Sequence, residues 1–146
     1  MIYYIGLGTN IGDKEANIHQ AKERLTEAGS IIQCSNNFYS EPWGFSSPNT
    51  FLNVVLALET PKNPFELLAF TQQVERDMGR QNKSHNGVYS DRIIDIDLLM
   101  YDGEDIHTET LQIPHPLIEQ RDFVKIPLQE VLDTLQQHTK ISRETY

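Results

Sequence analysis

The chain has 146 residues, of which 38% are hydrophobic and 23% are charged, and 12 basic against 21 acidic side chains give a net charge of −9. This length and composition fit one globular domain with its own core. No apolar run approaches the roughly 18 residues of a membrane-spanning helix, and we expect no signal peptide. An acidic surface repels phosphate backbones, so neither nucleic acid nor membrane is expected as a partner. The single Cys34 cannot form an internal disulfide, which favours a cytoplasmic location.

The first part of the chain is predicted to alternate strands with a helix. A buried strand over Met1–Leu7 leads into a Gly-x-Gly pattern, which allows close approach of the backbone. A core-facing helix follows Asp13 as its N-cap. Ser30–Tyr39 is expected to form a second strand. The turn-rich segment 40–49 then holds Trp43, for which a ligand-stacking role and a core role both stay open.

A third strand is predicted over Phe51–Thr60, with two faces of different character. Its core face would hold Leu52, Val54, Leu56 and Leu58, and its other face Phe51, Asn53 and Val55. A buried asparagine needs partners for both its amide and its carbonyl. A heterocycle with alternating donors and acceptors would satisfy Asn53, with Phe51 against the ring.

A second helix is predicted to begin at the capping box Asn63–Glu66 and to end at Gly79. Three polar residues lie off its apolar stripe and are expected to be a solvated flank: Gln72, Glu75 and Arg76. The segment Arg80–Asp91 that follows has no periodicity and carries Lys83 and Tyr89. An uncovered loop of this length predicts a lid, whose cations would exclude water over a triphosphate.

The rest of the chain is organised around an acidic strand predicted over Asp91–Tyr101, DRIIDIDLLMY. Alternation assigns Ile94, Ile96, Leu98 and Met100 to the core face, and Ile93, Asp95, Asp97 and Leu99 to the other. The two carboxylates then lie roughly 7 Å apart at the backbone. Burying an acid pair is unfavourable without a cation, and Mg²⁺ suits one or two carboxylates plus substrate phosphates. With Arg92 just upstream as a phosphate ligand, this face predicts a Mg²⁺ and nucleotide-phosphate site. The alternative is the solvated side of an amphipathic strand.

The last part of the chain combines turns with one long helix. Asp102-Gly103 predicts a two-residue hairpin, and Leu111–Ile113 a short strand. His115 stands between two prolines in a fixed extended conformation, where an anion-binding role and a structural role stay open. A final helix is expected from Pro127, with residues from about 138 onward frayed.

The order of these elements, β-α-β-β-α-β, predicts an α+β fold with a ferredoxin-like core, an additional C-terminal strand hairpin and helices. Residues 1–146 would form a single domain. With the helices on one face of the sheet, the other face would be free for Asn53, Asp95 and Asp97.

Six segments in this order resemble the 6-hydroxymethyl-7,8-dihydropterin pyrophosphokinase family of the folate pathway. They are Gly8–Gly12, Tyr39–Gly44, Phe51–Asn53, Glu75 with Gly79–Arg80, Asp91–Leu99, and Ile113–Pro116 through Arg121–Phe123. The resemblance covers about Ile2 to Leu135, nearly the whole chain. Fold alone would not support a function, whereas six ordered motifs do.

The resemblance implies transfer of the β,γ-diphosphoryl group of ATP to the pterin hydroxymethyl oxygen, giving AMP. Asp95 and Asp97 would hold two Mg²⁺ ions and, with Lys83 and Arg92, act in catalysis. The implied ATP contacts are Gln72, Glu75, Lys83, Arg92, His115 and Arg121. The implied pterin contacts are Glu41, Pro42, Trp43, Phe51, Asn53, Tyr89, Asp95 and Phe123. The expected partners are these small molecules alone, bound by a monomer.

Three positions depart from the family's pattern. Family members commonly carry a tryptophan and an extra arginine before the acidic strand, where this chain has Tyr89 as the candidate for stacking. Thr110 stands where some members have arginine, and Pro116 where some have tyrosine, so ATP affinity could differ. Two other functions stay open from the sequence: a D-x-D nucleotidyl or glycosyl transferase, and a ferredoxin-like sensor that binds its ligand without Mg²⁺.

Overall fold

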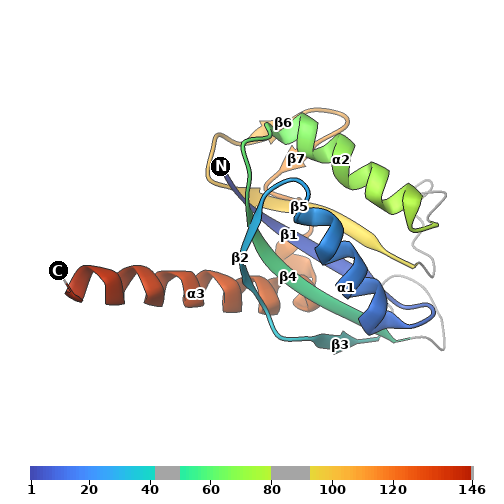
Figure 1. Cartoon of the computed structure of the whole chain (residues 1–146), viewed down its shortest axis with the longest axis horizontal. Helices are drawn as coiled ribbons and strands as arrows, with labels where there is room; N and C mark the ends of the chain where they lie inside the picture. The colour runs from blue at the N-terminus through green and yellow to red at the C-terminus, as the bar shows by residue number, and fades with distance from the viewer. Residues whose placement is uncertain (42–49, 80–92, 146) are drawn as a thin grey trace.

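The computed structural model of this chain describes residues 1–41, 50–79 and 93–145, with side chains as far as Gln136 (Figure 1). The elements in chain order are β1 (Ile2–Thr9), α1 (Lys14–Leu25), β2 (Ser30–Cys34), β3 (Phe38–Ser40), β4 (Phe51–Glu59), α2 (Pro64–Asp77), β5 (Asp95–Tyr101), β6 (Ile106–His107), β7 (Gln112–Ile113), the 3-10 helix η2 (Ile118–Gln120) and α3 (Asp122–Thr145). Within the described residues, no helix is long and apolar enough to cross a membrane. The predicted α+β class, an antiparallel sheet with three α-helices in these ranges, is confirmed.

The main sheet has the strand order β2-β4-β1-β5, and every neighbouring pair is antiparallel. The strand predicted over Ser30–Tyr39 is divided into β2 and β3, which both pair with β4. Ser35 lies at the break, where its N–H donates to Val55 O at 2.8 Å and its hydroxyl accepts from Val55 N–H at 3.0 Å. This side-chain contact replaces regular strand pairing and ends β2. The exact topology of a ferredoxin-like core stays a prediction.

One face of the sheet is covered by α1 and α2, which lie beside each other in front of the strands (Figure 1). The main core forms between these helices and the sheet. The predicted core face of β4 is confirmed, since it contributes Leu52, Val54, Leu56 and Leu58 to this core. The helix α2 also begins as predicted, because Asn63 and Glu66 each accept a hydrogen bond from the other's backbone N–H, at 2.9 and 3.0 Å.

The opposite face is not free, contrary to the expectation. There α3 crosses behind the sheet, and Leu128 and Val131 form a second core with Val55, Ala57 and Leu99 (Figure 1). The apolar stripe of α3 needs a partner, and the apolar half of this sheet face supplies it. The polar end of the same face, with Asn53 and the two aspartates, remains beside the first turn of α3.

The prediction for Met100 is wrong, because a bulge interrupts the alternation of β5. Leu98 pairs with Ile5 and Met100 with Tyr4, so Leu99 is an extra residue without a partner position in β1. An extra residue changes the face of those that follow. Met100 therefore packs with Leu99 in the second core rather than with the α2 side.

The last helix begins earlier than predicted, at Asp122 instead of Pro127. Arg121 O accepts the N–H groups of Val124 at 2.9 Å and Lys125 at 2.8 Å, which starts the first turn. Pro127 lies within the helix, where it leaves only one backbone bond unformed in the early turns. The helical backbone continues to Thr145, beyond the point near residue 138 at which the sequence suggested fraying.

The additional hairpin exists, but its turn is not Asp102-Gly103. β6 pairs with β7, with His107 opposite Gln112, and not with β5. Asp102 is instead held against β1, because its N–H donates to Ile2 O at 3.0 Å and its carboxylate accepts from Ile2 N–H at 3.1 Å. These two bonds end β5 at the sheet and prevent a tight reversal there.

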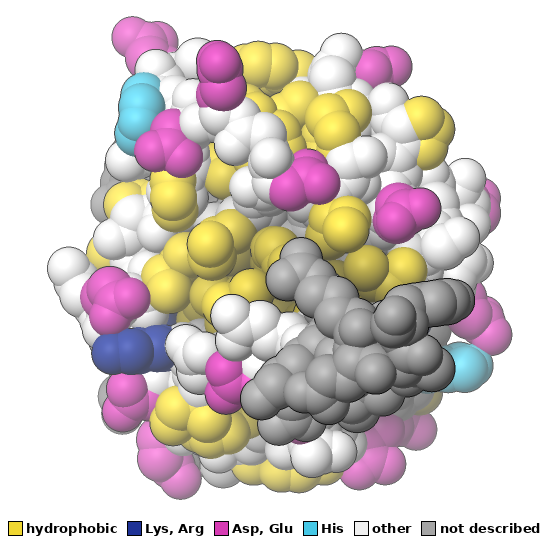
Figure 2. All heavy atoms as spheres, turned by 90° about the vertical axis from the view of Figure 1, so that its left-hand side faces the viewer, with side chains coloured by type: hydrophobic (Ala, Val, Ile, Leu, Met, Phe, Trp, Pro, Cys, Tyr) yellow, Lys and Arg dark blue, Asp and Glu magenta, His cyan; other side chains and the backbone are white. Residues whose placement is uncertain are grey.

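On one end of the molecule, acidic side chains surround a hydrophobic centre and basic side chains are sparse (Figure 2). This distribution agrees with the net charge of −9. A bound anion must therefore be held by local cations or by a metal, because the overall field repels it.

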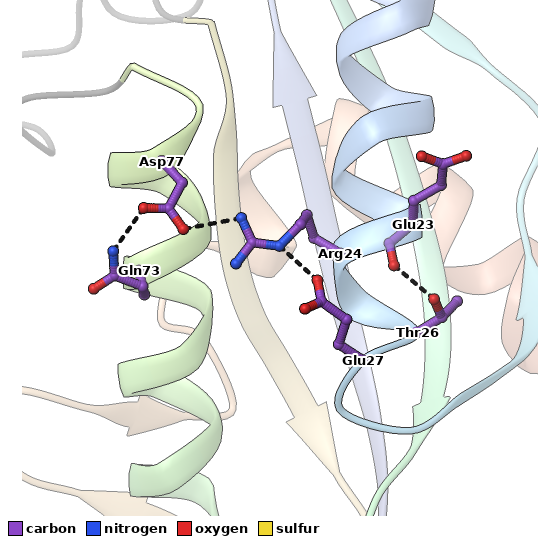
Figure 3. Close-up of polar contacts among 6 residues, drawn as sticks. All are labelled: Glu23, Arg24, Thr26, Glu27, Gln73 and Asp77. Carbon is purple, nitrogen blue, oxygen red and sulfur yellow. Dashed lines mark hydrogen bonds and ion pairs between the residues drawn. The ribbon is translucent and has the colours of Figure 1, made fainter.

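The helices α1 and α2 are joined by Arg24 of α1, which lies between Glu27, just beyond the end of α1, and Asp77 of α2 (Figure 3). Its Nε contacts Glu27 Oε2 at 2.6 Å and its Nη1 contacts Asp77 Oδ2 at 2.9 Å. Gln73 donates to the other carboxylate oxygen of Asp77 at 2.7 Å. The C-terminal end of α2 is therefore fixed against α1.

Replacing Asp77 with asparagine should remove a part of the stability that depends on pH. The hydrogen bond from Gln73, followed by the contact with Arg24, lowers the pKa of Asp77 below its ordinary value of 3.8. A lowered pKa stabilises the fold above the unfolded value, and this contribution is lost as the pH falls through the folded value. The difference in melting temperature between the wild type and Asp77→Asn should therefore shrink between about pH 6 and pH 3, as thermal melts can measure. A difference in melting temperature that stays constant with pH would contradict a stabilising role of the ionised Asp77.

Candidate active site

A pocket opens on the sheet face where the first turn of α3 begins. Together with the part open to solvent it holds about 550 Å³ that protein atoms do not fill. It is lined by β1, β4, β5 and the start of α3, through Gly6, Leu7, Gly8, Phe51, Asn53, Val54, Val55, Asp95, Asp97, Leu99, Arg121, Phe123 and Val124. A largely apolar pocket with a few convergent polar groups is typical of a small-molecule site.

Two glycines of β1 form the floor between the two polar strands. Gly8 pairs with Asn53 of β4 on one side and with Asp95 of β5 on the other. Gly6 lies in the same way between Val55 and Asp97. With strands about 4.8 Å apart, Asn53 and Asp95 are separated by roughly 10 Å at the backbone, with no side chain between them.

Asp95 and Asp97 are half-buried and both line the pocket, so their predicted common face is confirmed. Two carboxylates at this spacing fit Mg²⁺, which takes one or two protein carboxylates and completes its shell with water and phosphate oxygens. Among the described residues, no group of three or more His, Cys, Asp and Glu side chains gathers to hold a metal. The pair on β5 is thus the candidate metal site in the described part of the chain.

Asn53 is a buried polar residue, 7% exposed. Its Nδ2 donates to Ser40 Oγ at 3.3 Å, a contact that links β4 to β3. The carbonyl oxygen lies toward β1, because a Cβ added to Gly8 would stand 2.8 Å from Asn53 Oδ1. An amide oriented in this way can offer both a donor and an acceptor to a flat ligand.

Alanine at position 8 should weaken binding of the pocket's ligand about tenfold, because the new methyl group forces the Asn53 amide out of place. Calorimetric titration of Gly8→Ala with the pterin that the family resemblance implies as the ligand measures the effect. Gly6→Ala is the matched control on the same strand. Its Cβ would meet Leu99 Cδ1 at 3.3 Å, a contact that a shift of a few tenths of an ångström relieves, so the loss should be smaller. Equal losses in the two variants would contradict this.

The start of α3 brings a buried cation and an aromatic ring to the pocket. Arg121 is 5% exposed, and its guanidinium lies 5.7 Å from the centre of the Phe123 ring. Burial lowers the pKa of Arg121 to about 10, so it stays protonated at neutral pH. A buried cation beside an aromatic face suits a ligand that is both flat and anionic.

The expectation that Glu75 lies on a solvated flank is wrong. Its side chain is 4% exposed, and its Oε2 accepts a hydrogen bond from Ile96 N–H at 2.9 Å. The signal in the sequence is the spacing: Glu75 stands at i+4 in the helical pattern i, i+3, i+4, i+7 that begins at Thr71. The other members, Thr71, Val74 and Met78, are buried as well. Gln72 is half-buried, and Arg76 is exposed as predicted.

His115 lies beside β5, on the side away from β1. Its backbone N–H donates to Leu99 O at 2.8 Å, and its ring Nδ1 accepts from the backbone N–H of Leu117 at 3.2 Å. With Nδ1 as acceptor, the neutral ring carries its proton on Nε2. Glu75 and His115 thus both contact the outer edge of β5, whereas the pocket lies on the sheet face.

The structure brings together six of the predicted site residues in the pocket: Phe51, Asn53, Asp95, Asp97, Arg121 and Phe123. Glu41 is exposed at the end of the described segment that follows β3. Five others lie outside the described residues: Pro42, Trp43, Lys83, Tyr89 and Arg92. The lining residues that no site prediction named are Gly6, Leu7, Gly8, Val54, Val55, Leu99 and Val124. The Gly-x-Gly pattern in a strand is a signal for Gly6 and Gly8, because residues two apart share a face.

A family model for 7,8-dihydro-6-hydroxymethylpterin-pyrophosphokinase matches residues 4–133. The chain belongs to this family. A relative from Porphyromonas gingivalis, 2-amino-4-hydroxy-6-hydroxymethyldihydropteridine pyrophosphokinase, is 44% identical over 132 residues that cover 89% of this chain and 90% of the relative. The protein of the same name from Bacillus subtilis is 39% identical over 89% of this chain and 77% of its own length. The protein is therefore an enzyme of the pyrophosphokinase class.

The same domain also occurs within longer proteins. The bifunctional protein FolKE of Lactococcus lactis is 38% identical over 89% of this chain, which corresponds to 37% of FolKE. The crystal structure of Plasmodium falciparum HPPK-DHPS with pteroate matches with a TM-score of 0.64 at 15% identity, over 84% of this chain and 39% of that one. This structural likeness shows the pyrophosphokinase fold alone.

Proposed function

We propose that the protein transfers the β,γ-diphosphoryl group of ATP to 6-hydroxymethyl-7,8-dihydropterin in folate biosynthesis. The hydroxymethyl oxygen forms a bond to Pβ, and the bond from Pβ to the oxygen that bridges to Pα breaks. AMP leaves with the bridging oxygen, and the hydroxyl proton passes to solvent. The products are AMP and the pterin diphosphate.

The observation that carries this proposal is the row Asn53, Gly8, Asp95 across three neighbouring strands. It supports an arrangement in which an amide recognises the pterin edge on β4 while the carboxylates of β5 face the reacting group. Phe51 and Phe123 line the same pocket and suit the faces of a flat ring. Glu41, Pro42, Trp43 and Tyr89 complete the proposed pterin contacts.

Asp95 and Asp97 are the proposed ligands of two Mg²⁺ ions. Bound there, Mg²⁺ would neutralise charge on the phosphates of ATP. Gln72, Lys83, Arg92, His115 and Arg121 are proposed on the ATP side, with Lys83 and Arg92 next to the transferred group. Diphosphoryl transfer relies mainly on positioning and electrostatic stabilisation, so the residues need to hold charges in place rather than supply a strong base.

We also propose that the enzyme works in the cytoplasm as a monomer with small-molecule partners. Cys34 is a free, half-buried thiol in the described structure, which fits a reducing compartment.

Product analysis tests the proposed function directly. The protein is incubated with ATP, Mg²⁺ and the reduced hydroxymethylpterin, and nucleotides are separated by chromatography. AMP should form only when all three are present. Formation of ADP would indicate an ordinary kinase, and release of pyrophosphate or of a nucleoside diphosphate from a donor would indicate a D-x-D transferase.

A further inference from the structure

Glu75 is a buried carboxylate that touches the backbone of the acidic strand. It projects from α2 on the core side of the sheet, and it is absent from the described residues that line the pocket. Burying a carboxylate is unfavourable unless hydrogen bonds to it compensate, and a leucine would pack at this position without that cost. The contact of Glu75 Oε2 with Ile96 N–H is therefore the feature that distinguishes it from a packing residue.

Ile96 lies between Asp95 and Asp97, so a shift of its backbone changes the position of both carboxylates. Within the described sheet, β5 pairs on one side only, with β1. Successive N–H groups of a strand point in opposite directions, so the N–H groups of the two aspartates point toward β1 when that of Ile96 points outward to Glu75. The strand segment that carries the acid pair is thus held by β1 on one side, and on the other side it contacts the carboxylate of Glu75.

The helix that carries Glu75 is itself well fixed at this point. Thr71, Val74 and Met78 are buried around it. Two residues further on, Asp77 is joined to α1 through Arg24 (Figure 3). A rigid helix can transmit its position to β5 through the hydrogen bond between Glu75 and Ile96, because little of the helix can move to compensate.

We infer that Glu75 is a positioning residue: through Ile96 N–H it sets the place of Asp95 and Asp97 in the pocket. This inference rests on the proposed function for its kinetic consequences. A small misplacement of metal-holding groups is costly in catalysis, since reacting atoms must be aligned closely. A direct ATP contact, which the family resemblance implies for this residue, leads to different consequences in the same experiment.

Two substitutions separate these roles. Glu75→Gln keeps an oxygen that can accept from Ile96 N–H, whereas Glu75→Leu has similar volume and no acceptor. We expect Glu75→Leu to lower kcat for AMP formation about tenfold to a hundredfold with the KM for ATP within about threefold. We expect Glu75→Gln to keep kcat within about threefold of the wild type. Glu75→Met, which is flexible and also lacks an acceptor, replaces the leucine variant if that fails to fold.

Hydrogen exchange of the Ile96 amide gives a readout without turnover. Its protection should fall at least about tenfold in Glu75→Leu and stay near the wild-type value in Glu75→Gln. The amide of Leu56, in the centre of the sheet, should not change in either variant. These measurements decide the inference even if the wild type forms no AMP, an outcome that would overturn only the proposed function.

The inference is overturned if Glu75→Leu leaves Ile96 exchange and kcat unchanged. It is also overturned if both variants raise the KM for ATP to the same extent while Ile96 remains protected, because this pattern indicates direct contact with the nucleotide.

Discussion

Replacing Asp97 with asparagine should lower AMP formation by on the order of a thousandfold, while the fold is kept. Asp97 is half-buried, lines the pocket and lies opposite Gly6, where no side chain can take over its role. Asparagine has the same size but no charge, and the single carboxylate left at Asp95 is a weak ligand for Mg²⁺. Rates measured over a series of Mg²⁺ concentrations should show activity that rises only at much higher metal concentration.

A matched control for this variant is Asp105→Asn, which removes an exposed carboxylate beyond the end of β5. It changes the net charge by the same amount and should leave the rate unchanged. If Asp97→Asn kept a rate within about tenfold of the wild type at ordinary Mg²⁺ concentrations, the acid pair would not be the metal site.

Leucine in place of Asn53 should weaken binding of the hydroxymethylpterin by on the order of a hundredfold or more. Leucine nearly matches the shape of asparagine, but it can neither donate nor accept a hydrogen bond, so the polar edge of the ring would be desolvated without compensation. The affinity for ATP should stay the same. Calorimetric titration of each substrate measures the two effects separately.

Ser40→Ala is the control for Asn53→Leu, since it removes only the partner of Asn53 Nδ2. The amide stays in the pocket, so pterin affinity should fall by a few-fold at most, in line with the loss of one partly buried hydrogen bond. Equal affinity of the wild type and Asn53→Leu for the pterin would exclude Asn53 as the group that recognises it.

The predictions that depended on local pattern are confirmed where nothing interrupts the pattern. The two faces of β4 follow strict alternation, and the capping box at Asn63 forms as its sequence indicates. Met100 was assigned to the wrong face because the position of a bulge depends on how β5 pairs with β1, and a single strand does not reveal this. The same applies to the break between β2 and β3, which depends on a contact of Ser35 with Val55 of another strand.

The candidate site was predictable to the extent that its side chains share a strand face. The common face of each pair is predicted correctly, because residues two apart in a strand point the same way. The pairs are Asp95 with Asp97 and Phe51 with Asn53. Glu75 was misplaced because an acidic residue at the margin of an apolar stripe is usually solvated, and only the tertiary structure provides the backbone N–H that stabilises it when buried. The start of α3 is also not predictable from the sequence. The helix begins with backbone hydrogen bonds to Arg121 O, whereas Pro127 in the sequence suggests a later first turn.

The glycine floor of the pocket has a consequence for inhibitor design. A compound that rests on the main chain at Gly6 and Gly8 contacts atoms that every amino acid has, so point mutations can evade it chiefly by adding a side chain there. At position 8 that side chain would push into Asn53 and, on the proposed function, impair recognition of the substrate as well. Resistance arising at Gly8 should therefore carry a loss of fitness, in contrast to resistance at the exposed rim.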